Sequence, residues 1–481
     1  MAEHFHLARI TIQLLSPLSV ASGDGGWLDV ALLRDANGLP MLSGAAIKGL
    51  LRELADSTTE RLSGNADSAG RLLFSHGAVH DSKNVAVYQL RRPADIESDA
   101  ILKNLRREAP LLRDHVKLTE RGTAEETAKY DRTAVPRGTR FSFEIGLWGK
   151  VEEVNALKQV VQLAWHPLFR PGGATRRGYG RVGVVHATTQ SFDCSKTDEL
   201  TTLPQIRGDP WSTPLKGDEV EAPGSGDDVR ELLLTLTARG LWRAGSEGEV
   251  AGLGTRRGRK ESNPAREVDA AFTREPKIVW ANGTASWHAP EPLGDQTATL
   301  WPNPPGHDDF VLQGSSIRGA LAHRALFHWN RENDGLVDAD NPPDAAALAR
   351  LTRRRDGLIA LFGDARDVSN SADQGQRSAL IVEDVVFRPE QVTLAEHNSI
   401  DRFSGGVRNA VLFSEELVQT GALEFRLLID ASIKVPKDAL AALAAALDDL
   451  VNGRLALGAK SSGRFEGDMS AIKVFCGGGA A

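Results

Sequence analysis

Two short motifs of glycine, small residues and one basic residue give the first indication of chemistry. Residues Leu42–Leu50 read LSGAAIKGL, and residues Leu312–Ala320 read LQGSSIRGA. Glycine and small side chains at the start of a helix let another backbone approach closely, and the free N–H groups there favour an anion. Lys48 and Arg318 add positive charge at the same place. The pattern suits a phosphodiester backbone that is held without reading its bases, although close helix-to-sheet packing would use the same small residues.

Two glycine-rich loops lie later in the chain, at Gly172–Gly183 (GGATRRGYGRVG) and Gly458–Gly467 (GAKSSGRFEG). Each contains arginine and one aromatic residue, Tyr179 or Phe465. Glycine permits tight turns, arginine contacts phosphate, and an aromatic ring can stack on a base. A simple flexible turn is the alternative. The residues predicted to bind RNA are Ser43, Gly44, Lys48, Arg52, Arg176, Arg177, Tyr179, Arg181, Ser315, Ser316, Arg318, Lys460 and Arg464.

These features recur in the same order, which indicates an internal duplication. The two helix motifs start 270 residues apart, at residues 42 and 312. His115 opens HVKLTERG and His397 opens HNSIDRFSGG, 282 residues apart, and an aromatic residue follows each, Tyr130 and Phe413. Because one short motif often matches by chance but three ordered matches do not, we interpret the chain as two copies of one domain.

Composition changes sharply between the two copies. Ser191–Asp228 is rich in Thr, Pro, Gly, Ser and acidic residues and has no apolar period, so we predict a linker there. The first domain is then residues 1–190 and the second is residues 229–481. An insertion at residues 245–277 is polar and basic, and we expect it to be mobile or to become ordered on a partner.

Hydrophobic periodicity predicts the same elements in each copy. In the first, an alternating strand at Phe5–Leu15 precedes an amphipathic helix at Ile47–Ala55, and a second helix at Val151–Trp165 precedes the glycine-rich loop. The corresponding elements of the second copy are Leu232–Leu241, Ile317–Trp329 and Lys437–Val451, and a further strand is predicted there at Leu380–Phe387. The order β-α-β-β-α-β predicts the α+β class, with two tandem ferredoxin-like (RRM-type) domains carrying insertions.

As a group, these motifs resemble the RAMP superfamily of CRISPR-associated proteins. HNSIDRFSGG followed by LFSEE (Leu412–Glu416) resembles the backbone subunits of type III effector complexes. FGD (Phe362–Asp364) followed by SALIVEDVVF (Ser378–Phe387) resembles them too. The resemblance covers nearly all of both copies except the linker and the insertion. Ala45-Ala46 stands where the family usually has two serines, and neither copy has the usual proline before the glycine.

The resemblance implies a function for two aspartates. Such subunits polymerise along a CRISPR RNA and present it to a complementary target RNA. In many of them, an aspartate in the loop before the glycine motif cuts the target with a divalent metal, Mg²⁺ or Mn²⁺. Asp29 and Asp295 are the best matches to this catalytic, metal-binding position, with Asp24, Asp308 and Asp309 as alternatives. One or two carboxylates plus a substrate phosphate suffice to bind hydrated Mg²⁺, but aspartates also commonly cap turns.

Three functions are therefore open. The chain is a metal-dependent endoribonuclease acting on target RNA, a non-catalytic RNA-binding scaffold, or an endoribonuclease that processes CRISPR RNA by acid–base catalysis. His6, His76 and His115 are the candidates for the third function. The expected partners are CRISPR RNA, target RNA and other CRISPR effector subunits at both ends of the chain, because stacked repeats leave open interfaces.

The bulk composition sets limits on these readings. The net charge of −7 argues against general nucleic-acid affinity, but only residues that face the phosphates release counterions. Cys194 and Cys476 are too few for a disulfide framework or a zinc cluster. The first 15 residues lack the pattern of a signal peptide and no apolar run could cross a membrane, so we expect a cytoplasmic protein. The basic runs are Arg176-Arg177, Arg256–Lys260 and Arg353–Arg355.

Overall fold

The chain forms two units, each built around one of the two copies. The computed structural model describes residues 4–23, 29–55, 62, 64, 70–118, 124–208, 214–224, 228–245, 270–289, 300–302, 309–332, 357–364, 375–459, 462–467 and 473–476. The first unit comprises Met1–Thr175, Tyr179–Ser225 and Pro276–His288. The second unit comprises Arg176–Gly178, Gly226–Glu275 and Ala289–Ala481. Each unit therefore includes a short segment from the other copy's stretch of sequence.

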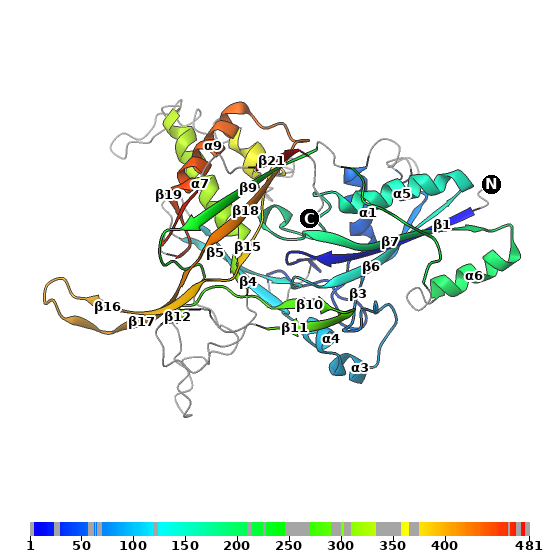
Figure 1. Cartoon of the computed structure of the whole chain (residues 1–481), viewed down its shortest axis with the longest axis horizontal. Coiled ribbons are helices and arrows are strands. Elements are labelled where there is room, and N and C mark those ends of the chain that lie inside the picture. Colours follow the sequence, from blue (N-terminus) through cyan, green and yellow to red (C-terminus); the bar gives the residue numbers. More distant parts are fainter. Residues whose placement is uncertain are drawn as a thin grey trace. The chain divides into compact units, whose positions relative to one another are not determined.

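An antiparallel sheet with β1 at its centre forms the first unit. Its main elements are β1 (His4–Leu14), α1 (Gly44–Leu54), β2 (Leu72–Phe74), β3 (Ala78–Val79), β6 (Arg140–Gly149), α5 (Val154–Gln162), β7 (Val182–Asp193) and β8 (Asp218–Glu219). The strand order is β2-β6-β1-β7-β8, with β3 also on β6. Figure 1 shows β1 between β6 and β7. The first strand thus lies between the third and fourth strands of a β-α-β-β-α-β unit, which is the ferredoxin-like arrangement.

Alternation along β1 places apolar side chains on both faces of the sheet. Ala8, Ile10 and Ile12 belong to the core that also contains residues of α1 and α5. Phe5 and Leu7, on the opposite face, form a second cluster with residues of α6 (Thr197–Gly208). The central strand is therefore covered on both sides, which explains why its apolar residues are almost entirely buried.

Helix α6 corrects the prediction that residues 191–228 lack regular structure. Strand β7 continues to Asp193, and α6 packs Leu203 and Ile206 against the sheet. The helix was missed because these two buried side chains do not form an apolar stripe and because Pro204 lies inside it. The boundary between the two units lies at Ser225, close to the end of the predicted linker.

The second unit repeats the topology of the first. Its main elements are β9 (Val229–Ala238), α7 (Gly314–Glu332), β14 (Leu380–Val382), β18 (Ala422–Asp430), α9 (Lys437–Val451), β19 (Asn452–Leu457), β20 (Gly463–Glu466) and β21 (Lys473–Cys476). The strand order is β14-β18-β9-β20-β19, and β21 also pairs with β9. The predicted α+β class with tandem ferredoxin-like domains is confirmed. The predicted strand at Leu380–Phe387 is two strands, β14 and β15 (Val385–Phe387), which belong to different sheets.

A buried carboxylate joins the two helices of the second unit. The Oδ2 atom of Asp449 in α9 accepts hydrogen bonds from Arg324 Nε at 2.5 Å and His328 Nε2 at 2.6 Å, both in α7. These bonds, together with one from Arg454, outweigh burial and lower the pKa of Asp449 to about 2. The helix pair is thus fixed by an ion network as well as by apolar packing.

Each unit carries a hairpin between its second and third sheet strands. The hairpins are β4 (Leu111–Leu118) with β5 (Ala124–Ala134), and β16 (Gln391–Ile400) with β17 (Val407–Gln419). Figure 1 shows β16–β17 extending away from the sheet of its unit. His115 lies opposite Tyr130 with ring centroids 5.1 Å apart, and His397 lies opposite Phe413 at 5.0 Å. The duplication predicted from the sequence therefore extends to single side-chain pairs.

A second hairpin, β10 (Lys277–Ala281) with β11 (Thr284–His288), belongs to the first unit although it follows the second unit's first strand. Trp280 Nε1 donates to the carbonyl of Gly138 at 2.7 Å, and the guanidinium of Arg140 lies 4.0 Å from the centre of a Trp280 ring. Ile278 is buried in the first core. Most of the predicted insertion, residues 246–269, lies outside the described residues. Among the described residues, no helix is long and apolar enough to span a membrane.

His80 makes the first unit sensitive to acid. Its ring lies 2.6 Å from Ser142 Oγ and 2.9 Å from Asn84 Oδ1, and burial lowers its pKa to about 4. The unfolded chain takes up a proton on this ring near pH 6.5, whereas the folded unit does so only near pH 4. The free energy of unfolding is therefore highest above about pH 6.5 and decreases as pH falls toward 4. We predict a loss on the order of 3 kcal/mol over this window, which His80→Gln removes.

Urea unfolding of wild type, His80→Gln and the control His186→Gln at about pH 7 and about pH 4.5 measures this effect. His186 is an exposed histidine of the same sheet, so its substitution should leave the wild-type pH dependence intact. Equal acid sensitivity in wild type and His80→Gln would contradict the prediction.

Candidate functional site

The first glycine of each helix motif is required for packing. Gly44 N donates to His76 Nδ1 at 3.2 Å, and Gly314 N donates to Asp384 Oδ1 at 2.8 Å. A Cβ at Gly44 would lie 2.8 Å from two backbone oxygens, and one at Gly314 would lie 2.4 Å from another. Any side chain here would push α1 away from the end of β2, or α7 away from the end of β14. The packing explanation therefore holds for these two positions.

Close packing does not explain the second glycine of each motif. A Cβ at Gly49 or Gly319 would meet nothing within 4 Å among the described residues. Glycine inside a helix costs about 0.5–1 kcal/mol relative to alanine. Each glycine lies one turn after a small residue, Ala45 or Ser315, on the same face of its helix. Both repeats thus present a smooth helix face on which another backbone could lie.

Three of the predicted RNA-binding arginines come together in the second unit. Burial, together with the positive charges of Arg177 and Arg176, lowers the pKa of Arg318 to about 10. Arg176 Nη2 forms an ion pair with Asp430 at 3.0 Å, whereas Arg177 is exposed. Arg318 donates from Nη2 to the carbonyl of Phe362, and its buried Nε has no hydrogen-bond partner among the described residues. Clustered cations with an unsatisfied buried donor favour an anion.

The aromatic residues of the two glycine-rich loops are both part of the protein interior. Tyr179 is completely buried, its hydroxyl lies 3.0 Å from His115 Nε2, and the Arg113 guanidinium covers its ring at 4.8 Å. Phe465 is completely buried in the second core. The prediction that Tyr179 stacks on a base was wrong, because the ring is used to fix the loop against the hairpin β4–β5.

The remaining predicted RNA-binding residues differ in exposure. Arg52, Ser316 and Arg464 are exposed, and Arg464 Nη1 donates to the carbonyl of Gly453 at 2.8 Å. Lys48, Arg181 and Ser315 are half-buried. Ser43 is the N-cap of α1, where its hydroxyl accepts from Ala46 N at 3.1 Å. Predicted residues outside the described part of the chain are Lys460, Asp24, Asp295, Asp308 and the basic runs Arg256–Lys260 and Arg353–Arg355.

The three candidate histidines are engaged in separate structural contacts. His6 is buried and lies 2.7 Å from Ser191 Oγ and 2.8 Å from the carbonyl of Lys150, and burial lowers its pKa. His76 accepts the hydrogen bond from the first residue of α1. His115 stacks on Tyr130 in the hairpin. Each histidine thus has a role in the fold that does not involve catalysis.

Asp29 is exposed and is held by a second aspartate. Its Oδ2 atom accepts from the backbone N–H of Asp131 at 2.9 Å, and its own backbone N–H donates to Asp131 Oδ1 at 2.9 Å. The Oδ1 atom of Asp29 has no hydrogen-bond partner among the described residues. No group of three or more His, Cys, Asp or Glu that could hold a metal occurs in the described part of the chain. The site therefore offers an exposed carboxylate, not a preformed metal cage.

The same backbone register occurs at the root of both hairpins. The carbonyl of Val30 accepts from Thr133 N at 3.0 Å, and the carbonyl of Ala270 accepts from Glu416 N at 2.9 Å. Thr133 and Glu416 each lie three residues after the aromatic residue that stacks on the hairpin histidine. Val30 and Ala270 are therefore equivalent residues of the two repeats.

This register identifies a position that the sequence comparison missed. Asp29 precedes Val30 in LDVALLRD, and Asp269 precedes Ala270 in VDAAFTRE. Asp269 itself lies outside the described residues. The similarity of the two octapeptides was a usable signal, but their separation of 240 residues differs from the 270-residue separation of the glycine motifs. Asp309, the other described alternative, forms an ion pair with Arg388 at 3.6 Å.

An exposed aromatic residue at the tip of β16–β17 was also missed. Phe403 is completely exposed, and Ile400 and Val407 beside it are 64% exposed. Asp401 Oδ1 accepts from the backbone N–H groups of Phe403 and Ser404 at 3.0 and 2.9 Å, which fixes the turn. An exposed aromatic ring on an ordered turn is the kind of surface on which a base stacks.

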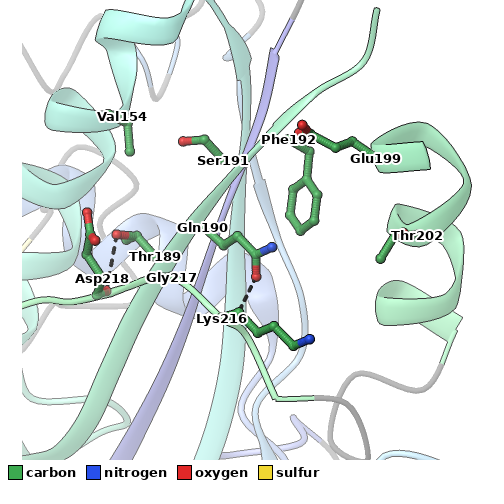
Figure 2. Close-up of a pocket in the computed structure, with 10 residues that line it drawn as sticks. All are labelled: Val154, Thr189, Gln190, Ser191, Phe192, Glu199, Thr202, Lys216, Gly217 and Asp218. Carbon is green, nitrogen blue, oxygen red and sulfur yellow. Dashed lines mark hydrogen bonds between the residues drawn. The ribbon is translucent and has the colours of Figure 1, made fainter. Parts of the chain in front are cut away.

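The groove of about 520 Å³ shown in Figure 2 is lined by none of the predicted RNA-binding or catalytic residues. It lies in the first unit beside the end of β7 and α6. Gln190 Oε1 accepts from Lys216 N across it at 2.8 Å. Its lining residues are Val154, Thr189, Gln190, Ser191, Phe192, Glu199, Thr202, Lys216, Gly217 and Asp218. The candidate site is therefore an open surface and not this groove.

Comparison with known proteins agrees with the duplicated fold. No curated protein matches the chain. A family model described as the RAMP superfamily matches residues 11–183 and 305–466, one region in each repeat, which together make up more than half of the sequence. RAMP proteins are CRISPR-associated and bind RNA. With two ferredoxin-like units, glycine motifs at equivalent helix starts and a family match in each repeat, the chain belongs to the RAMP superfamily.

Proposed function

We propose that this protein is a backbone subunit of a type III CRISPR effector complex, which binds CRISPR RNA and presents it to a complementary target RNA. The observation that carries the proposal is the convergence of Arg318 with Arg176 and Arg177, because a partly buried group of cations is best satisfied by a polyanion. The net charge of −7 does not oppose it, since only charges near the phosphates act on them.

The helix faces indicate how the RNA backbone would be held. Gly49 and Gly319 leave room for a phosphodiester chain to lie close to each helix. Lys48 and Arg318 supply charge beside it. Such contacts carry no base preference, as expected of a subunit that must accept any guide sequence. Phe403 at the hairpin tip would stack on a base without selecting its identity.

We further propose that the protein cleaves the target RNA with a divalent metal, Mg²⁺ or Mn²⁺. The exposed carboxylate of Asp29 fits this role, because Mg²⁺ is commonly bound through one or two carboxylates together with a substrate phosphate. The bound ion would stabilise negative charge at the cut phosphate. Asp29 would hold the ion, and the N–H of Asp131 would orient the Asp29 carboxylate. In the second repeat we favour Asp269 over Asp295 for this role.

A non-catalytic RNA-binding scaffold is the main alternative, and the aspartates would then only stabilise their loops. Processing of CRISPR RNA by acid–base catalysis has less support, because His6, His76 and His115 each serve in separate contacts of the fold. Chelation separates these functions, since it abolishes metal-dependent target cleavage and spares acid–base processing.

Substitution of the aspartates tests the cleavage proposal. We predict that Asp29→Ala removes one cut in the target RNA and that Asp269→Ala removes another, while target binding stays intact. Asp295→Ala serves as the matched control and should leave both cuts. Mapping the cleavage products of the complex with CRISPR RNA and Mg²⁺, with and without a chelator, measures this. An unchanged pattern in Asp29→Ala would leave the protein as a scaffold.

Alanine at the four motif glycines tests the RNA-binding face. Gly49→Ala and Gly319→Ala should leave the protein equally stable or more stable, by up to about 1 kcal/mol each. They should nevertheless weaken RNA binding several-fold, because the added methyl groups lie where the RNA backbone would lie. Gly44→Ala and Gly314→Ala should instead lower stability, because a Cβ there meets backbone atoms. Thermal denaturation and RNA titration measure both effects.

Unaltered RNA affinity in the Gly49→Ala and Gly319→Ala variants would contradict the assignment of these helix faces to the RNA.

A further inference from the structure

Asp131 makes two hydrogen bonds that together fix Asp29. The Asp131 carboxylate accepts from Asp29 N at 2.9 Å, and the Asp131 backbone N–H donates to the Asp29 carboxylate at 2.9 Å. One bond fixes the backbone of Asp29 and the other fixes its side chain. Two bonds in opposite directions between the same residues determine both position and rotamer.

The hairpin β4–β5 holds this pair through strand β5. Asp131 lies in β5, directly opposite Asp114 in β4. Two residues later, Thr133 donates from its N at 3.0 Å and from its Oγ1 at 2.5 Å to the carbonyl of Val30. The segment Asp29–Val30 is thus held by four hydrogen bonds from one strand. Since Asp29 is exposed, these bonds and not core packing set its position.

We propose that Asp131 is a positioning residue for the first repeat, which acts on cleavage only through Asp29. The inference rests on the proposed function, since it needs Asp29 to act on the target RNA. An error of about 1 Å in the position of a catalytic group can lower a rate about 100-fold. Loss of the Asp131 carboxylate would remove the hydrogen bond to the backbone of Asp29 and leave the Asp29 carboxylate less precisely positioned.

The second repeat has a serine, which carries no carboxylate, at the position equivalent to Asp131. Ser414 follows Phe413, the partner of His397, as Asp131 follows Tyr130, and it lies two residues before Glu416. The backbone carbonyl of Ser414 accepts from the N–H of Ala270, the residue equivalent to Val30, at 3.1 Å. Dependence on Asp131 should therefore be limited to the cut made by the first repeat.

The experiment compares Asp131→Ala and Asp131→Asn in the complex with CRISPR RNA, using single-turnover cleavage of target RNA with Mg²⁺. Asparagine keeps an acceptor oxygen for Asp29 N but removes the charge. We expect Asp131→Ala to slow the first repeat's cut by 10- to 100-fold, with target binding and the other cut unchanged. Asp131→Asn should restore the rate to within a few-fold of wild type. Asp114→Ala, which removes a carboxylate directly opposite, should have no effect.

Several results would overturn the inference. A wild-type rate in Asp131→Ala would show that the two bonds do not matter for cleavage. Equal loss in Asp131→Ala and Asp131→Asn would show that the charge of Asp131 acts directly. Loss of both cuts or of target binding would show a general structural defect. Failure of the proposed function itself gives a different result, because Asp29→Ala would then leave cleavage unchanged.

Discussion

The antiparallel pairing of the first strand with both the third and the fourth strand organises each unit. In the first unit, β1 pairs from His4 to Gln13 with β6 and from His4 to Leu14 with β7. This central strand buries apolar residues on both faces, so its position is fixed by packing as well as by hydrogen bonds. The segment that follows it, which contains Asp29, and the hairpin that precedes β6 must then meet beside the same sheet.

The contact between this segment and the hairpin has the same backbone hydrogen bond in both repeats but different side chains. Thr133 and Glu416 bind equivalent carbonyls, yet Thr133 adds only a hydroxyl bond, whereas Glu416 also accepts from Phe272 N at 2.8 Å and pairs with Arg274. The duplicated fold thus supplies two similar positions along one chain, and side-chain replacement has made them unequal.

Much of this could be predicted from the sequence, because helix and strand periodicity are local. The helix at Lys437–Val451 has the predicted bounds, and the glycine motifs begin α1 and α7. The base-stacking role of Tyr179 was wrong, because burial depends on a hairpin 64 residues away in sequence. Helix α6 and the register that points to Asp269 were not predicted for a similar reason, since both depend on contacts between distant segments.

The salt dependence of RNA affinity tests most directly whether the protein holds RNA through its phosphates. A single-stranded RNA of arbitrary sequence should bind with an affinity that falls linearly with salt on logarithmic scales, and Arg177→Gln should reduce the slope by about one. Changing the base sequence should alter the affinity little. An affinity insensitive to salt, or a slope that Arg177→Gln leaves unchanged, would contradict the account of an arginine-lined RNA-backbone site.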